Sequence, residues 1–131
     1  MFMTIELKML ALSAVLGLVQ IILSSHSASL QYGYKWAASA RDEFMEPLQG
    51  IAGRLDRALR NFTETFPLFA AAVLTISIAG RHNWMTVYGT QLYFWGRVLY
   101  IPLYAGGVPL FRSLIWNVAT LGIVLILISL L

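Results

Sequence analysis

The residues with the clearest chemical potential lie in the segment 54–67, where charged side chains enter an otherwise apolar sequence. Four polar residues follow one another at steps of three, four and three and would share one face of a helix: Arg54, Arg57, Asn61 and Glu64. A guanidinium group binds a planar anion through two parallel hydrogen bonds, whereas a carboxylate holds an ammonium group. This face predicts a binding site for a small molecule that carries several anionic groups.

Two further arginines in apolar surroundings extend this prediction. Arg97 shares a helical face with three tyrosines at steps of three or four: Tyr93, Tyr100 and Tyr104. Arg112 precedes Ser113 and a charge-free segment. Charged side chains inside a membrane are costly and usually functional. Because the arginines at positions 54, 57, 60, 97 and 112 would repel one another at one membrane depth, we expect an anionic ligand among them.

Glutathione carries the groups that such a site would bind, namely two carboxylates, one ammonium group and a thiol. The chain contains no cysteine, so any thiol must come from a ligand. A neighbouring guanidinium lowers the pKa of a thiol, and we expect Arg112 to keep the thiol of glutathione ionised. Tyr104 and Ser113 are candidate hydroxyl donors to the sulfur. Glutathione is therefore the expected cosubstrate.

The composition indicates an integral membrane protein. Of 131 residues, 59% are hydrophobic and 11% are charged, with a mean hydropathy of +0.73, whereas about a quarter of the residues in a soluble domain are charged. Cysteine is absent and His, Asp and Glu form no metal-ligand spacing, so we expect no metal site. No basic run stands apart from the apolar segments, and membrane lipid rather than nucleic acid is the expected partner.

Apolar stretches predict four membrane-spanning helices, at about residues 5–30, 51–79, 84–104 and 109–131. With short second and third connections, they predict an all-α, up-down four-helix bundle that forms a single transmembrane domain over residues 1–131. The segment 31–53 is polar and predicts a loop, in which 41–43 favours a local helix start. A cleaved signal peptide is the alternative interpretation of the first apolar segment, because that segment ends in a serine-rich stretch.

The distribution of cations predicts the orientation in the membrane. One end of the predicted bundle holds most of them: Lys35, Arg41, Arg54, Arg57, Arg60 and Arg112. The opposite end has Lys8 and Arg81. Because cytoplasmic loops carry an excess of Lys and Arg, the arginine-rich end should face the cytoplasm and both termini should lie on the outer side.

The order and spacing of these residues resemble the MAPEG family (membrane-associated proteins in eicosanoid and glutathione metabolism). The segment Arg54-x-x-Arg57-Ala58-x-x-Asn61-x-x-Glu64-x-x-Pro67 is similar to the most specific motif of that family. Later segments that resemble family motifs are Gly96-Arg97, Tyr104 and Val108-Pro109-x-x-Arg112-Ser113. The resemblance covers residues 53–116, and the four-span pattern extends it to the whole chain.

This resemblance implies a homotrimer in a bacterial inner membrane, with glutathione bound between neighbouring subunits near the cytoplasmic side. The implied glutathione-binding residues are Arg57, Arg60, Asn61, Glu64, Arg97 and Tyr104. Arg112, with Ser113, would stabilise the thiolate for attack on a lipophilic electrophile, as in a glutathione transferase or peroxidase. Lys35 is the nearest match to a cation that the family supplies from the exit of its first helix.

Other interpretations remain open at the level of sequence. The family includes members without catalysis, so the chain could instead be a membrane lipid-binding or scaffold protein. Trp116 stands where some members carry a tyrosine, and it can stack against a ligand but donates no hydroxyl. The arginines could also have structural roles, Arg97 in an ion pair with Glu64 or Asp56, and Arg112 as a cation that reaches the membrane surface.

Overall fold

The computed structural model describes residues 3–131, which form helices and their connections. The helices are α1 (Ile5–Tyr32), α2 (Tyr34–Ala38), α3 (Gly50–Ala79), α4 (Trp84–Ala105) and α5 (Pro109–Leu130). Each bound of the four long helices lies within two residues of its predicted position. The short helix α2 is an addition to the predicted set.

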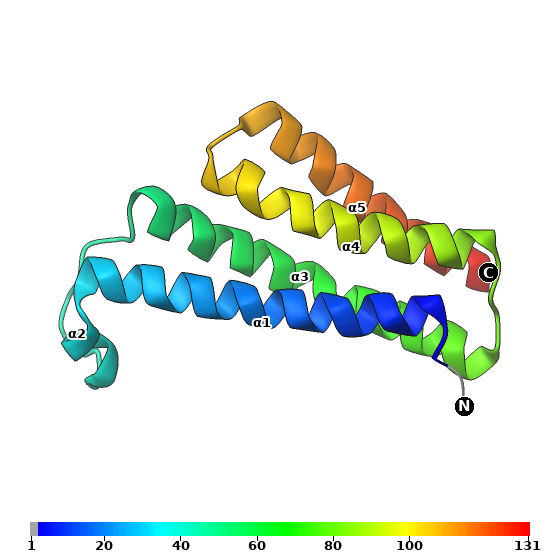
Figure 1. Cartoon of the computed structure of the whole chain (residues 1–131), viewed down its shortest axis with the longest axis horizontal. Helices are drawn as coiled ribbons and strands as arrows, with labels where there is room; N and C mark the ends of the chain where they lie inside the picture. Colours follow the sequence, from blue (N-terminus) through cyan, green and yellow to red (C-terminus); the bar gives the residue numbers. More distant parts are fainter. Residues whose placement is uncertain (1–2) are drawn as a thin grey trace.

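The four long helices alternate in direction and form two antiparallel pairs, α1 with α3 and α4 with α5 (Figure 1). The start of α1 and the end of α5 lie at one end of the bundle, and α2 and the α4–α5 turn lie at the other (Figure 1). The two pairs are close together near the termini and diverge toward the end that carries α2 (Figure 1). This arrangement confirms the predicted all-α, up-down four-helix bundle.

Three of the long helices, α1, α3 and α5, are long and apolar enough to cross a membrane. Helix α4 has 22 residues, which is sufficient length for a crossing, but Gln91, Arg97 and several tyrosines make it less apolar. Much of its polar surface is buried inside the bundle, including the side chains of Thr86, Thr90 and Arg97. The chain is thus a multi-pass membrane protein, and the crossing by α4 stays a prediction.

Helices α4 and α5 form the closest pair because glycines remove side chains from their contact. A Cβ atom added to Gly96 would lie 3.1 Å from the Cβ of Ala119, and one added to Gly122 would lie 2.9 Å from the backbone nitrogen of Tyr93. Gly122 also faces the carbonyl oxygen of Gly89. Small residues let membrane helices approach until their backbones touch, which maximises van der Waals contact. This pairing holds the middle and second half of α5 against the middle and first half of α4.

Helix α3 is held against α4 by aromatic packing. The Phe69 and Tyr93 rings are stacked with centroids 4.0 Å apart, and both side chains are buried. The Tyr93 hydroxyl lies 3.0 Å from the Thr65 hydroxyl, which gives the phenol a polar partner inside the bundle. These contacts of Thr65 and Phe69 fix which face of α3 is turned toward α4.

The connection between α1 and α3 departs from the predicted loop. Helix α2 forms there, and its Trp36 packs edge-on against Tyr32 with ring centroids 4.7 Å apart. Arg41 has a φ of 61°, a left-handed conformation that an α-helix excludes, and its guanidinium donates to the Ala37 carbonyl oxygen. The predicted helix start at 41–43 is therefore wrong, because aromatic packing places the helix before those residues.

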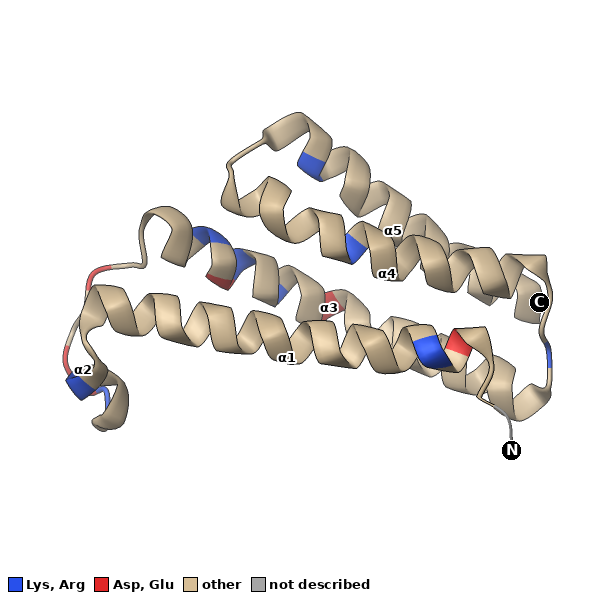
Figure 2. Cartoon of the chain, viewed as in Figure 1, with Lys and Arg blue, Asp and Glu red and all other residues tan. Residues whose placement is uncertain are grey.

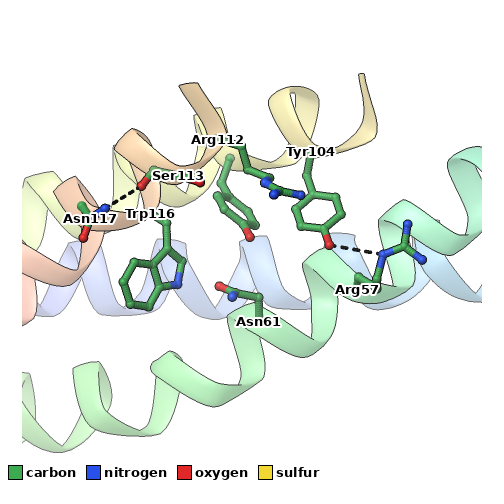
Figure 3. A pocket seen from close by; sticks show the side chains of 8 residues that line it. Arg57, Asn61, Tyr104, Arg112, Ser113, Trp116 and Asn117 are labelled. Atoms are coloured by element: carbon green, nitrogen blue, oxygen red, sulfur yellow. Dashed lines mark hydrogen bonds between the residues drawn. The ribbon is translucent and has the colours of Figure 1, made fainter. Parts of the chain in front are cut away.

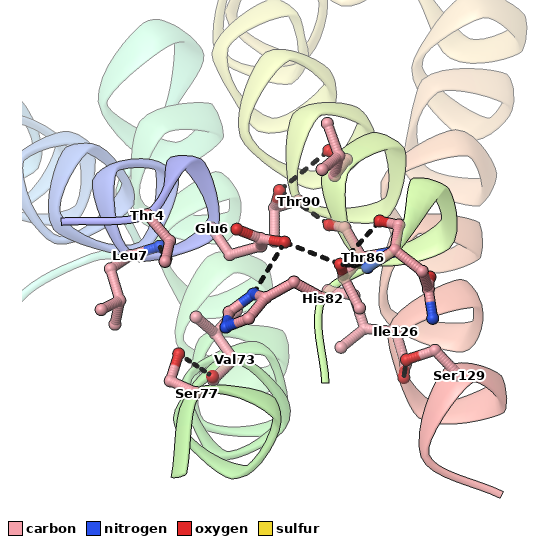
Figure 4. A network of polar contacts seen from close by, with 12 residues as sticks. Thr4, Glu6, Leu7, Val73, Ser77, His82, Thr86, Thr90, Ile126 and Ser129 are labelled. Atoms are coloured by element: carbon pink, nitrogen blue, oxygen red, sulfur yellow. Dashed lines mark hydrogen bonds and ion pairs between the residues drawn. The ribbon is translucent and has the colours of Figure 1, made fainter. Parts of the chain in front are cut away.

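A polar network joins α1 to the start of α4 at the end of the bundle that holds the termini (Figure 4). The Glu6 carboxylate is 2% exposed and accepts a hydrogen bond of 2.7 Å from the Thr86 hydroxyl. The same carboxylate oxygen lies 3.1 Å from Nδ1 of His82. Asn83 begins α4, because its side chain accepts from the backbone nitrogens of Met85 and Thr86. The network therefore ties the first turn of α1 to the first turn of α4.

Replacing Glu6 with alanine should destabilise the bundle by about 2 kcal/mol, because it removes the acceptor shared by Thr86 and His82 and leaves a gap. The midpoint temperature of unfolding in detergent measures this effect. Lys8→Ala is the matched control, because Lys8 lies two residues from Glu6 on α1 but is exposed. This variant should leave the midpoint unchanged. Equal midpoints for both variants would show that the network contributes nothing to stability.

Candidate functional site

A cavity of about 460 Å³ lies between α3, α4 and α5, at the end of the bundle where the helix pairs diverge (Figure 3). Its wall consists of polar and aromatic side chains from all three helices: Arg57, Asn61, Tyr100, Tyr104, Arg112, Ser113, Trp116 and Asn117. The volume is in the range of small-molecule sites, about 300–1,000 Å³. Five of the eight predicted site residues therefore line one cavity: Arg57, Asn61, Tyr104, Arg112 and Ser113.

Tyr104 lies between two guanidinium groups (Figure 3). Nε of Arg57 donates a hydrogen bond of 3.2 Å to the Tyr104 hydroxyl oxygen. The guanidinium carbon of Arg112 lies 4.7 Å from the centre of the same ring, where it gains a cation–π interaction. Because the phenol oxygen accepts from Arg57, its own proton is free to be donated into the cavity. Two cations and one hydroxyl donor thus converge on one side of the cavity.

Asn61 connects the cavity to a buried cation behind it. Nη1 of Arg97 donates a hydrogen bond of 2.8 Å to Oδ1 of Asn61. The Arg97 side chain is 1% exposed, and its guanidinium carbon lies 4.4 Å from the Tyr100 ring centre and 5.7 Å from that of Phe62. Because Oδ1 is engaged by Arg97, the amide nitrogen of Asn61 is the group left to donate into the cavity.

Besides Arg112, helix α5 supplies one serine, one tryptophan and one asparagine to the cavity wall. The Ser113 hydroxyl donates to the Pro109 carbonyl oxygen at 3.2 Å, and the Asn117 amide donates to the Ser113 carbonyl oxygen at 2.9 Å. Nε1 of Trp116 is shielded from solvent and has no hydrogen-bond partner among residues 3–131. An unpartnered indole N–H in a cavity wall is a ready donor for a bound ligand. Ser113 would have to leave Pro109 before it could donate to a sulfur atom.

Arg60 and Glu64 do not line this cavity. The Arg60 side chain is 75% exposed and its Nε lies 3.1 Å from Asp56, one turn earlier on α3. It borders a different hollow, beside Tyr32, Pro47 and Leu48. Glu64 is exposed on the surface of α3. Within this chain, the predicted binding residues are therefore divided among the cavity wall, the buried position of Arg97 behind Asn61, and the outer surface of α3.

The alternative in which Arg97 forms an ion pair with Glu64 or Asp56 is wrong for this chain. Among the described residues the ion pairs are Asp56 with Arg60 and Glu6 with His82. Arg54 donates to the carbonyl oxygen of Ala105 at 3.1 Å, so it caps the end of α4 rather than entering the cavity. Arg57 and Arg112 have no acid within ion-pair distance in residues 3–131.

The arrangement favours the binding of an anion. Two guanidiniums face the cavity without a neutralising carboxylate, and the neutral donors of Tyr104, Asn61 and Trp116 surround them. Charged residues cluster along α3 near this end of the bundle (Figure 2). A thiol held beside Arg112 would ionise more readily, because a cation stabilises the thiolate. The arrangement therefore has the chemistry suited to a polyanionic molecule and to a thiol that must be ionised.

Two residues of the cavity wall, Tyr100 and Asn117, were not among the predicted site residues. Tyr100 shares the helical face of Arg97 and Tyr104, so its position in the wall follows from the same periodicity. Asn117 lies one turn after Ser113, which is the corresponding signal on α5. Spacing could have identified both residues once the face of each helix was known.

Comparison with protein-family models finds a match to the MAPEG family over residues 9–131. The matched range includes α2 to α5, most of α1 and every residue of the cavity wall. Searches among curated proteins and among solved structures found no match. The matched range, together with the four-helix membrane fold, shows that this chain belongs to the MAPEG family, whose members are membrane glutathione-dependent transferases or peroxidases or eicosanoid-related proteins.

Proposed function

We propose that this protein is a glutathione-dependent transferase or peroxidase-like enzyme of the membrane. In this proposal, glutathione binds in the cavity between α3, α4 and α5, and its ionised thiol attacks lipophilic electrophiles. The observation that carries the proposal is the pair of guanidiniums, Arg57 and Arg112, on either side of Tyr104 in the cavity wall. Neither has an acidic partner among the described residues, so an anionic ligand would supply the missing charge.

The residues present fit glutathione by their chemistry. Arg57 would hold a carboxylate through its guanidinium fork, while the amide nitrogen of Asn61 would donate to a carbonyl or carboxylate oxygen. The unpartnered indole N–H of Trp116 would donate to a further acceptor of the tripeptide. Family membership adds independent support, because glutathione is the typical ligand of the family.

Arg112 would act on the thiol. Its guanidinium would stabilise the thiolate, and the thiol proton would pass to water at the open side of the cavity. The sulfur electron pair would then form the new S–C bond while a leaving group departs from the electrophile with its bonding electrons. Tyr104 would donate a hydrogen bond from its hydroxyl to the thiolate sulfur, or would donate its phenolic proton to the departing group. Ser113 would take part only after releasing the Pro109 carbonyl oxygen.

We further propose that a neighbouring subunit completes the cavity in a homotrimer. Lys35, Arg60 and Glu64 do not line the cavity of this chain, so they would reach glutathione only across a subunit boundary. Chemical cross-linking in detergent tests this proposal. Trimer bands support it, and a clean monomer that still binds glutathione would show that one chain forms the whole site.

The arginine-rich end of the bundle would face the cytoplasm of a bacterium, with both termini outside. Because the chain has no cysteine, a single introduced cysteine is the only side-chain thiol of this protein, and its labelling reports the orientation directly. A membrane-impermeant thiol reagent should label Ser39→Cys only after the cells are opened. Labelling of intact cells at that position would reverse the orientation.

The Arg57→Ala protein should bind glutathione about 10- to 100-fold more weakly, the loss expected for charged hydrogen bonds to one carboxylate. Isothermal titration of the detergent-solubilised protein measures this change. Arg81→Ala is the matched control, because Arg81 lies at the opposite end of the bundle and should leave the affinity unchanged. An unchanged glutathione affinity of the Arg57→Ala protein would show that glutathione does not bind in this cavity. If the wild type binds no glutathione, a lipid-binding or scaffold function becomes the better account.

A further inference from the structure

Asn117 is a residue of the cavity wall that the proposed glutathione chemistry does not use. Its amide nitrogen donates to the Ser113 carbonyl oxygen at 2.9 Å, the contact drawn as a dashed line in Figure 3. Because a carbonyl oxygen only accepts hydrogen bonds, this contact holds the amide nitrogen toward Ser113 and turns Oδ1 away from it. Among the hydrogen bonds within residues 3–131, none reaches Oδ1. Asn117 thus brings an unpaired acceptor to the cavity wall.

Asn117 lies well inside the apolar length of α5. It stands eight residues after Pro109, the first residue of the helix, and thirteen before Leu130, the last. At 1.5 Å per residue these separations are about 12 Å and about 20 Å along the helix axis. Helix α5 is long and apolar enough to cross a membrane. An amide oxygen at this depth is costly, because the hydrocarbon offers no hydrogen-bond donor to it.

The fold of α5 does not require this amide. In an α-helix the carbonyl oxygen of Ser113 already accepts from the backbone N–H four residues later, which is that of Asn117. Leu114 and Leu121 share this side of the helix, three residues before Asn117 and four after it, and they are 56% and 49% exposed. Asn117 is exposed as well. A leucine here would continue an apolar surface, so the asparagine indicates a ligand that brings a hydrogen-bond donor.

We propose that Asn117 determines specificity, because its Oδ1 accepts a hydrogen bond from a hydroxyl group on the lipophilic electrophile. This inference rests on the proposed function. Arg112, which would hold the sulfur atom of glutathione, stands five residues before Asn117, about 7.5 Å along the helix axis. A hydroxyl on the carbon next to the attacked carbon would lie between the two side chains. A 4-hydroxy-2-alkenal has this arrangement, and its alkyl chain would lie along Leu114 and Leu121.

The reaction with such an alkenal is an addition. The sulfur electron pair of glutathione forms a bond to the β-carbon, and the π electrons of the carbon–carbon double bond move toward the aldehyde, whose oxygen becomes an enolate oxygen. The α-carbon then takes a proton from water, which restores the aldehyde. No leaving group departs, and the hydroxyl on the γ-carbon keeps its proton throughout. Asn117 therefore orients the electrophile and takes no part in the bond changes.

Turnover of 4-hydroxy-2-nonenal and of 2-nonenal, which differ only in that hydroxyl, tests the proposal. The readout is the ratio of their kcat/KM values with glutathione, compared between proteins so that the intrinsic reactivities of the two aldehydes cancel. Asn117→Leu, which has a similar size but no acceptor, should lower this ratio about tenfold, the scale of one hydrogen bond. Asn117→Gln keeps the amide and should retain part of the preference.

Thr120→Val is the matched control, because Thr120 lies three residues after Asn117 on α5 but does not line the cavity. This variant should keep the wild-type ratio. Conjugation of both aldehydes with an equal ratio in the wild type and in Asn117→Leu would overturn the inference and leave the proposed function standing. Conjugation of neither aldehyde by the wild type would overturn both. If Asn117→Leu fails to fold, Asn117→Ala takes its place, because it also removes the acceptor and adds no apolar volume.

Discussion

The Arg112→Ala protein is expected to bind glutathione and to leave its thiol protonated. Arg112 is the cation that lies over the Tyr104 ring in the cavity wall, without an acidic partner among the described residues. Its removal takes away the positive charge that would stabilise a thiolate. Turnover of an electrophile should fall about 100- to 1,000-fold, as when one electrostatic group is removed from a reaction site. The ultraviolet absorbance of the thiolate measures the ionisation directly.

Arg112→Lys provides the control for charge, because it keeps the cation but loses the planar fork. It should retain part of the thiolate signal and part of the turnover. If Arg112→Ala ionises glutathione as well as the wild type does, the cation over Tyr104 has no chemical role. Arg112 would then be a residue that reaches the membrane surface, as the alternative interpretation of the sequence holds.

The Gly122→Leu protein is expected to lose the contact between α4 and α5. Even a Cβ atom at this position would meet the carbonyl oxygen of Gly89 and lie 2.9 Å from the backbone nitrogen of Tyr93. Both neighbours are backbone atoms, so the helices must separate to admit the side chain. The cost should be about 3 kcal/mol or more, at the upper end of the range for overpacked sites. Thermal unfolding in detergent should show a large fall in the midpoint.

Separation of α4 from α5 should also weaken glutathione binding, because Tyr104 and Arg112 come from these two helices. Val124→Leu adds one methylene to an exposed face of α5 and should change neither stability nor binding. A stable Gly122→Leu protein with normal glutathione affinity would contradict the close α4–α5 packing. A stable Gly122→Leu protein that does not bind glutathione would show that the α4–α5 contact controls the geometry of the site but not the stability of the bundle.

The fold could be predicted to a large extent from the sequence, because its signals are local. Long apolar segments define α1, α3 and α5, and Asn83 and Pro109 fit the starts of α4 and α5. Helix α2 could not be predicted, since its position depends on Trp36 packing against Tyr32 across the break at Gly33, whose φ is 94°. The glycines of the α4–α5 contact were visible in the sequence, but which partners they face depends on how the two helices are paired.

The candidate site could be predicted only in part. Helical periodicity correctly placed Arg57 and Asn61 on one face of α3. The same periodicity put Glu64 on that face, yet Glu64 is exposed, because spacing does not show where a neighbouring helix stops covering the face. Arg60 pairs with Asp56 four residues earlier, a local interaction that spacing alone indicates. The partner of Arg97 is a neutral amide, and charge counting could not have identified it.

A structure of the protein in lipid or detergent with glutathione bound tests the central claim most directly. The claim predicts glutathione in the cavity between α3, α4 and α5, with a carboxylate on the Arg57 guanidinium and the sulfur atom beside Arg112. Density for a neighbouring subunit would at the same time show whether Arg60 and Glu64 reach the ligand. Glutathione bound outside this cavity, or bound within it with the sulfur atom away from Arg112, would contradict the account.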